Sequence, residues 1–249
     1  MTVFFLECRA GDVPLDDRWL GPRERGLCSA LRLEKRRRDW RLGRWTAKQA
    51  LRRFQARTSD SPSPMPLDAT ELLPAPDGAP EFHGLSEPSS VQVSISHRGD
   101  VAVCAIAAHP LEVGIGCDLE SVETRSEGLV DDFFTGRERE AVARVPSTSK
   151  DPLVALIWSA KESALKVLRC GLRRDTRSVE VSVPDFERLL EQPATRASEN
   201  FHHFEVQDLG EGARFVGWWR CQDAQILTIA VRCPGGTRSE DMSPPIDLR

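Results

Sequence analysis

The stretch Ile157–Leu168, IWSAKESALKVL, is the segment around which the rest of the chain is organised. Apolar side chains recur there at helical spacing, which predicts a helix with one stripe against a core. These apolar positions are Leu153, one turn before the stretch, and Ile157, Ala160, Ala164 and Leu168 within it. Glu162 and Lys166 lie nearly opposite that stripe, with Lys161 on its flank. A solvent-facing Glu–Lys pair on an ordinary helix is one interpretation, and a functional site is the other.

A second segment, Val113–Glu120 with the sequence VGIGCDLE, predicts a strand with two different faces. Because side chains alternate along a strand, Asp118 and Glu120 share one face with Gly114 and Gly116, and the residues between them face a core. Glycines allow a backbone or a ligand to come close. Neighbouring carboxylates repel each other unless a cation or solvent relieves them, and Mg²⁺ commonly bridges carboxylates to phosphates. Two solvated acids at a strand end are the alternative.

Taken together, these segments resemble the paired signature of the 4′-phosphopantetheinyl transferases. The matching motifs are Val113–Glu120, Trp158–Lys166 with the sequence WSAKESALK, and Ser94–His97, SISH, at the end of a predicted strand. Their order and spacing are similar to those of the single-chain, Sfp-like branch. The resemblance implies Mg²⁺-dependent transfer of 4′-phosphopantetheine from coenzyme A to a serine of an apo acyl or peptidyl carrier protein, which leaves adenosine 3′,5′-bisphosphate.

The resemblance also implies roles for individual residues. A divalent cation, Mg²⁺ or alternatively Mn²⁺, would be held by Asp118, Glu120 and Glu162. Glu162 is the first candidate for the general base, and the other catalytic candidates are Lys166 and Lys161. The residues that would bind coenzyme A are Arg44, Lys48, Ser96, His97, Asp118 and Lys166. The family often carries a GKP segment, which reads Gly78-Ala79-Pro80 here, so one phosphate contact is missing.

A short repeat predicts two related halves. Trp45–Gln49, WTAKQ, and Trp158–Glu162, WSAKE, are nearly the same pentapeptide. We expect an α+β fold of two pseudo-twofold-related lobes, each a long helix packed on a small antiparallel sheet, as the resemblance also implies. The expected division is 1–111, 112–233 and a flexible tail, 234–249. Gln49 stands where Glu162 stands, so one active site is expected, and a monomer suffices to build it.

Local patterns place the remaining elements. Strands are expected at Thr2–Cys8, in a hairpin of Val91–His97 and Val101–Ala107, and near Val179–Val183, His202–Leu209, Ala213–Cys221 and Ile226–Arg232. Helices are expected at Pro22–Leu33, within Arg32–Arg57 and at Glu138–Val145. The Pro-rich segment from Thr58 to Pro88 is expected to be a surface excursion with a short strand at best. Phe133 and Phe134 suit either a core or the docking of a partner helix.

Composition bounds the function further. The chain has 249 residues and a net charge of −4, which does not suggest general nucleic-acid binding. No apolar run is long enough for a membrane span, and the N-terminus lacks the basic region of a secretory signal. Seven scattered cysteines are expected to be reduced thiols in the cytoplasm. The basic segment Arg32–Arg57 forms either a solvated face or an anion site at Arg44 and Lys48.

Three rival functions follow from the same residues. A Mg²⁺-dependent phosphoesterase would use the same acids on a nucleotide and need no carrier protein. A binding module would hold coenzyme A or a carrier protein without chemistry. A nucleic-acid binder would rest on the basic helix alone, which has few aromatic stacking partners.

Overall fold

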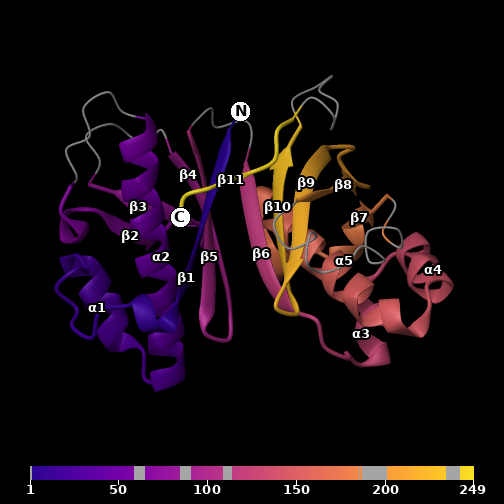
Figure 1. The fold of residues 1–249 in the computed structure, drawn as a ribbon, viewed down its shortest axis with the longest axis horizontal. Helices are drawn as coiled ribbons and strands as arrows, with labels where there is room; N and C mark the ends of the chain where they lie inside the picture. The colour runs from indigo at the N-terminus through magenta and orange to yellow at the C-terminus, as the bar shows by residue number, and fades with distance from the viewer. Residues whose placement is uncertain are drawn as a thin grey trace. The chain divides into compact units, whose positions relative to one another are not determined.

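The computed structural model describes residues 2–58, 65–84, 91–108, 114–184, 186, 201–233 and 242–249. They form two compact units: unit 1 is Met1–Leu111 with Pro245–Arg249, and unit 2 is Glu112–Pro244. Both units combine helices with sheets (Figure 1), so the predicted α+β class is confirmed. Among the described helices, none has both the length and the apolar character that crossing a bilayer requires.

Unit 1 is a sheet covered on one face by a long helix. Its strands follow the order β11 (Ile246–Asp247), β1 (Val3–Arg9), β5 (Val101–Ala108) and β4 (Val91–Arg98). The covering helix is α2 (Glu34–Thr58), and a short helix, α1 (Pro22–Ala30), precedes it. Leu42, Ala47 and Leu51 on α2 pack against Leu6 and Ile106 of the sheet. The basic segment is thus amphipathic, and its apolar stripe fixes the helix on the sheet.

Unit 2 repeats this plan with a wider sheet. Its strands follow the order β6 (Ile115–Ser121), β10 (Gln225–Arg232), β9 (Arg214–Gln222), β8 (His202–Asp208) and β7 (Val179–Ser182), and all neighbours are antiparallel. The covering helix is α5 (Ser147–Val167), after the short helices α3 (Glu127–Phe133) and α4 (Gly136–Arg144). Ile157, Ala160 and Ala164 lie in one core with Phe204 and Ile226, as the helical spacing predicts.

The two units share a topology as well as a pentapeptide. In each, the first strand is followed by a long helix and later by a hairpin, and the second hairpin strand pairs back with the first strand. These triplets are β1-β5-β4 in unit 1 and β6-β10-β9 in unit 2. The repeated pentapeptides occupy corresponding places on α2 and α5. Two related halves therefore account for the repeat.

Two predictions, for the Pro-rich segment and for the C-terminal tail, are wrong. The Pro-rich excursion contains two paired strands, β2 (Glu71–Pro74) and β3 (Pro80–His83), joined by a turn with Gly78 at φ 88°. The tail is docked at its end, because β11 pairs with β1 and the Leu248 N–H donates to the Phe5 carbonyl at 2.9 Å. Leu248 is only 3% exposed, so burial of this apolar side chain holds the terminus. Residues 234–241 lie outside the described part.

Candidate active site

Strand β6 and helix α5 come together at two glycines. A Cβ atom on Gly114 would lie 2.6 Å from the Val167 carbonyl oxygen, and one on Gly116 would overlap the Ser163 carbonyl oxygen. Real side chains do not tolerate such distances, so only glycine allows the helix backbone to approach this strand. The sequence predicted that a backbone or a ligand comes close to these glycines, and the structure shows that it is the backbone of α5. This close approach sets the helix against the face of β6 that carries Asp118.

Asp118 is buried and held by a lysine of α5. It is 5% exposed, and its Oδ1 accepts a hydrogen bond from Lys166 Nζ at 2.8 Å. Lys166 Nζ also donates to the Cys117 carbonyl oxygen at 2.9 Å. Burial is the largest influence and lowers the pKa of Lys166, but the charge and hydrogen bond of Asp118, together with Cys117 and Glu162, outweigh it, so the net pKa is raised. Lys166 is therefore a charged partner of the strand acid.

Glu162 lies in the electrostatic field of both strand acids. Its pKa is raised to about 7, first by burial and then by the negative charge of Asp118, with a smaller contribution from Glu120. Lys166 opposes this rise. Like charges within a few ångströms disfavour ionisation of one another. The sequence prediction that these three acids gather from a strand and a helix is consistent with this coupling.

Glu120 forms an ion pair with Arg125, which the sequence motifs did not predict. Arg125 Nη2 donates to Glu120 Oε2 at 2.6 Å, and both side chains are mostly buried, at 14% and 13% exposure. Glu123 Oε1 lies 3.9 Å from the same nitrogen. Arg125 follows Glu120 by five residues in a loop, where strand and helix periodicity give no signal. Only the need of a half-buried acid for a counter-charge could have pointed to it.

The donor set suits a hard cation, although the acids do not form a closed metal cluster. In the described part of the chain, no three His, Cys, Asp or Glu side chains are grouped so that they could hold a metal ion. Asp118 is bound to Lys166 and Glu120 to Arg125, which occupies two of the three acids. Carboxylate oxygens are the ligands that Mg²⁺ and Mn²⁺ prefer. The carboxylates of Asp118, Glu120 and Glu162 are therefore suitable ligands for a divalent cation. Such a cation would compete with Lys166 for Asp118 and with Arg125 for Glu120.

Lys161 is a core residue, which corrects its assignment as a catalytic candidate. It is 0% exposed, and its Nζ contacts the Thr176 carbonyl at 2.9 Å, the Val179 carbonyl at 2.6 Å and Glu138 Oε2 at 2.8 Å. Three acceptors saturate its three donors. Glu138 also accepts the N–H of Val181 at 2.7 Å. Lys161 thus ties α5 to α4 and β7 and does not reach the acid cluster.

Lys48 in unit 1 is bound in the same way, which corrects its assignment to coenzyme A. It is 1% exposed, and its Nζ contacts the Trp19 carbonyl at 3.0 Å, the Leu67 carbonyl at 2.8 Å and Glu24 Oε2 at 2.5 Å. Glu24 also accepts the N–H of Leu72 at 2.9 Å.

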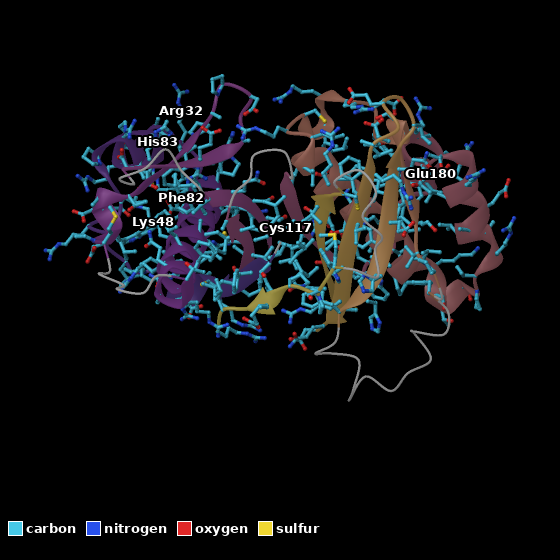
Figure 2. The ribbon with its side chains drawn as sticks, turned by 90° about the horizontal axis from the view of Figure 1, so that it is seen from above. Arg32, Lys48, Phe82, His83, Cys117 and Glu180 are labelled. Carbon is cyan, nitrogen blue, oxygen red and sulfur yellow. The ribbon has the colours of Figure 1, made fainter. Side chains whose placement is uncertain are left out.

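Figure 2 labels Lys48 within unit 1. It also labels Cys117 on β6 and Glu180 on β7, which are the two edge strands of the unit 2 sheet.

Arg44 and His97 line a common groove in unit 1, of about 580 Å³. The Arg44 guanidinium stacks on the Trp40 ring at 4.2 Å, and burial lowers its pKa to about 10, so it stays charged at neutral pH. Lys35 and Arg36 add positive charge to the same groove. In the described structure, the buried Arg44 Nε has no hydrogen-bond partner. The groove therefore offers cationic donors to an anion.

Ser96 does not share this groove, which corrects its assignment beside His97. Side chains alternate along β4, so Ser96 lies on the opposite strand face from Ile95 and His97. Ile95 and His97 line the groove, and Ser96 is 9% exposed. Ser96 and His97 are consecutive residues, but their side chains lie on opposite faces of β4.

Of the two adjacent aromatics at the C-terminal end of α3, one is in the core and the other is on the surface. Phe134 is 1% exposed and lies in the unit 2 core. Phe133 is 40% exposed and makes an edge contact with Trp158, with ring centroids 5.4 Å apart. The core interpretation thus holds for Phe134 alone.

The comparisons with known proteins agree with this reading of unit 2. Residues 114–217, which run from the start of β6 into β9, match the family model of the 4′-phosphopantetheinyl transferase superfamily. This stretch contains Asp118, Glu120, Glu162 and helix α5. The chain therefore carries a domain of the 4′-phosphopantetheinyl transferase superfamily. A comparison with curated proteins found no match.

Proposed function

We propose that this protein transfers the 4′-phosphopantetheine group of coenzyme A to a serine of an apo acyl or peptidyl carrier protein. The products are the holo carrier protein and adenosine 3′,5′-bisphosphate, and the reaction depends on Mg²⁺ or Mn²⁺. The observation that carries this proposal is the 2.8 Å contact between Lys166 of α5 and Asp118 of β6, with Glu162 of the same helix in the field of both strand acids, inside the stretch that matches this superfamily. We further infer the single-chain, Sfp-like branch, because one chain holds two halves with one set of acids, and a monomer is then sufficient.

The proposed reaction forms a bond between the serine oxygen and the phosphorus of the phosphopantetheine arm. The bond from that phosphorus to the oxygen of adenosine 3′,5′-bisphosphate breaks. The serine proton passes to Glu162, directly or through a water, because an unaided hydroxyl does not ionise at neutral pH. In the metal-free protein, burial and the charge of Asp118 raise the pKa of Glu162 to about 7, so its carboxylate takes up a proton more readily than that of an ordinary glutamate.

The cationic residues have separate tasks in this proposal. Lys166, on Asp118, is placed to offset negative charge that grows on the leaving group. A divalent cation held by Asp118, Glu120 and Glu162 would add charge stabilisation at the diphosphate. Arg44 and His97 are proposed to bind phosphate oxygens of coenzyme A, since both line one groove. Lys161 and Lys48 position helices and take no part in the chemistry.

The setting of the enzyme is also part of the proposal. All seven cysteines are free thiols, which suits a reducing compartment such as the cytoplasm. The carrier protein belongs to fatty acid, polyketide or nonribosomal peptide biosynthesis, because those pathways use the acyl or peptidyl carriers that the proposed activity serves.

The test is incubation of the purified protein with an apo carrier protein, coenzyme A and Mg²⁺. Intact-mass measurement of the carrier should report the phosphopantetheine increment, and EDTA should prevent it. A carrier variant with alanine in place of the acceptor serine is the matched control. Release of phosphate or pantetheine without a carrier would instead identify a phosphoesterase. Binding of coenzyme A without any product would identify a binding module.

A further inference from the structure

Arg125 stands out as a buried cation that the proposed chemistry does not use. Its Nη2 holds Glu120 Oε2 at 2.6 Å, and its side chain is 14% exposed. Its Nε is buried and, among the residues that the structure describes, has no hydrogen-bond partner. Buried guanidinium donors are normally satisfied, because an unmade bond costs free energy. Arg125 therefore has donor capacity beyond its contact with Glu120.

The loop that carries Arg125 is anchored without it. The Val122 N–H donates to the Ala224 carbonyl at 2.8 Å, which extends the β6–β10 pairing by one residue. Thr124 Oγ1 donates to Asp151 Oδ2 at 2.6 Å, which ties the loop to α5. Two contacts on either side of Glu123 thus fix the backbone, and the Arg125–Glu120 pair is not needed to hold the loop in place.

The geometry leads to a competition between cations. The same Glu120 carboxylate that would bind a divalent cation is held by Arg125, and a guanidinium and a metal ion repel each other at close range. Building on the proposed function, we propose that Arg125 occupies Glu120 in the metal-free protein, is displaced when a divalent cation binds, and then donates to a phosphate oxygen of coenzyme A. Arg125 is thus a positioning residue that couples cation binding to substrate binding.

The first test is a calorimetric titration with Mn²⁺ alone, without coenzyme A. Arg125→Ala removes the competitor, so the variant should bind Mn²⁺ about tenfold more tightly than wild type, the size expected for loss of one nearby positive charge. Arg137→Ala is the matched control, because it deletes an exposed arginine that pairs with Glu180 at 3.2 Å in the same unit. Arg125→Lys keeps the charge and should remain close to wild type.

The second test repeats the titration with coenzyme A, with and without saturating Mn²⁺. Arg125→Ala should weaken coenzyme A binding about fivefold with Mn²⁺ and leave it unchanged without Mn²⁺, because only the displaced guanidinium is free to contact phosphate. A residue with a merely structural role would not make the loss depend on Mn²⁺. Circular dichroism confirms folding, and Arg125→Gln serves as the second variant if the alanine variant does not fold.

The outcomes separate this proposal from the proposed function. If wild type loads the apo carrier but Arg125→Ala binds Mn²⁺ no more tightly than Arg137→Ala, the role of Arg125 is wrong and the transferase function stands. Equal loss of coenzyme A binding with and without Mn²⁺ also overturns the coupling. If wild type neither loads the carrier nor binds Mn²⁺ in the presence of coenzyme A, the proposed function itself fails.

Discussion

Units 1 and 2 share a framework and differ in some of the residues that it carries. In each unit, a lysine of the long helix is buried on a glutamate at the start of a short helix: Lys48 on Glu24 and Lys161 on Glu138. One helix position further on, unit 1 has Gln49 and unit 2 has Glu162. The first strand differs as well, because the helix-facing side of β1 is apolar, whereas β6 presents Asp118.

This difference teaches how to interpret a motif in a duplicated fold. Residues that both halves keep, such as Lys48 and Lys161, build the shared framework. Residues that occur in only one half, such as Glu162 in unit 2, are not needed for the framework and can have a function specific to that half. Within the pentapeptide WSAKE, the lysine therefore belongs to the fold, and the glutamate is the residue that we propose for the site.

The largest effect is expected from exchanging the residues that differ. Glu162→Gln gives unit 2 the unit 1 residue and should lower carrier loading by at least about a thousandfold, because the general base is lost. Coenzyme A binding should stay within about a few-fold of wild type, since phosphate contacts remain. The measurement is intact mass of the carrier over time. Gln49→Glu is the reciprocal control and should load the carrier normally. Retained turnover in Glu162→Gln would remove Glu162 from the mechanism.

Next in size is the effect of breaking the shared framework. Lys161→Met leaves Glu138 charged and buried without its cation, which typically costs about 3–5 kcal/mol. Lys48→Met should destabilise unit 1 by a similar amount, because Glu24 is equally buried. Urea unfolding measures both.

The control for the framework is a double change. Lys161→Met with Glu138→Gln removes both charges and should recover a large part of the loss. Should Lys161→Met be as stable as wild type while loading stops, Lys161 would belong to the active site after all.

A smaller effect is expected where glycine sets the distance between strand and helix. Gly116→Ala should destabilise the protein by about 1–3 kcal/mol, because the new Cβ atom overlaps the Ser163 carbonyl of α5 and forces the two apart. Gly43→Ala in unit 1 is the matched control, since its Cβ would meet Ile95 Cγ2 at an ordinary 3.5 Å. Inside helix α2, that change should stabilise by up to about 1 kcal/mol. Equal unfolding midpoints for the two variants would refute the close-approach argument.

The smallest effect is the pH dependence of stability that Glu162 contributes to unit 2. Glu162 has a folded pKa of about 7 against an ordinary value of 4.5, so the folded state binds its proton more tightly than the unfolded chain. Its charge thus destabilises the fold above about pH 7, and the cost disappears as the pH falls toward 4.5. Without divalent cations, Glu162→Gln should be more stable than wild type by about 1–2 kcal/mol at pH 8.

Thermal unfolding of both proteins in EDTA across this pH range provides the measurement. Near pH 4, where Glu162 is protonated and resembles glutamine, the two proteins should have equal stability. A stability difference that does not change with pH would mean that the carboxyl group is not coupled to its neighbours.

Much of the fold could be predicted because periodicity reports burial directly. The stripe of α5 and the alternation of β6 follow from spacing alone, and the repeated pentapeptide gave the two halves. Docking of Leu248 and pairing of β2 with β3 could not be predicted, because each depends on an edge or surface supplied by distant residues.

The candidate site was only partly predictable for the same physical reason. The coupling of Glu162 to Asp118 follows from two motifs. The burial of Lys161, in contrast, depends on Glu138, which a helical pattern around residue 161 cannot reveal. Arg125 was missed because loop residues follow no period.

The most direct test of the central claim is anomalous diffraction from crystals of the wild-type protein grown with Mn²⁺ and coenzyme A. We predict one Mn²⁺ peak within coordination distance of the carboxylates of Asp118 and Glu162, with a phosphate oxygen of coenzyme A as a further ligand. A Mn²⁺ ion bound elsewhere, or coenzyme A bound with these carboxylates too far apart to share an ion, would contradict the account.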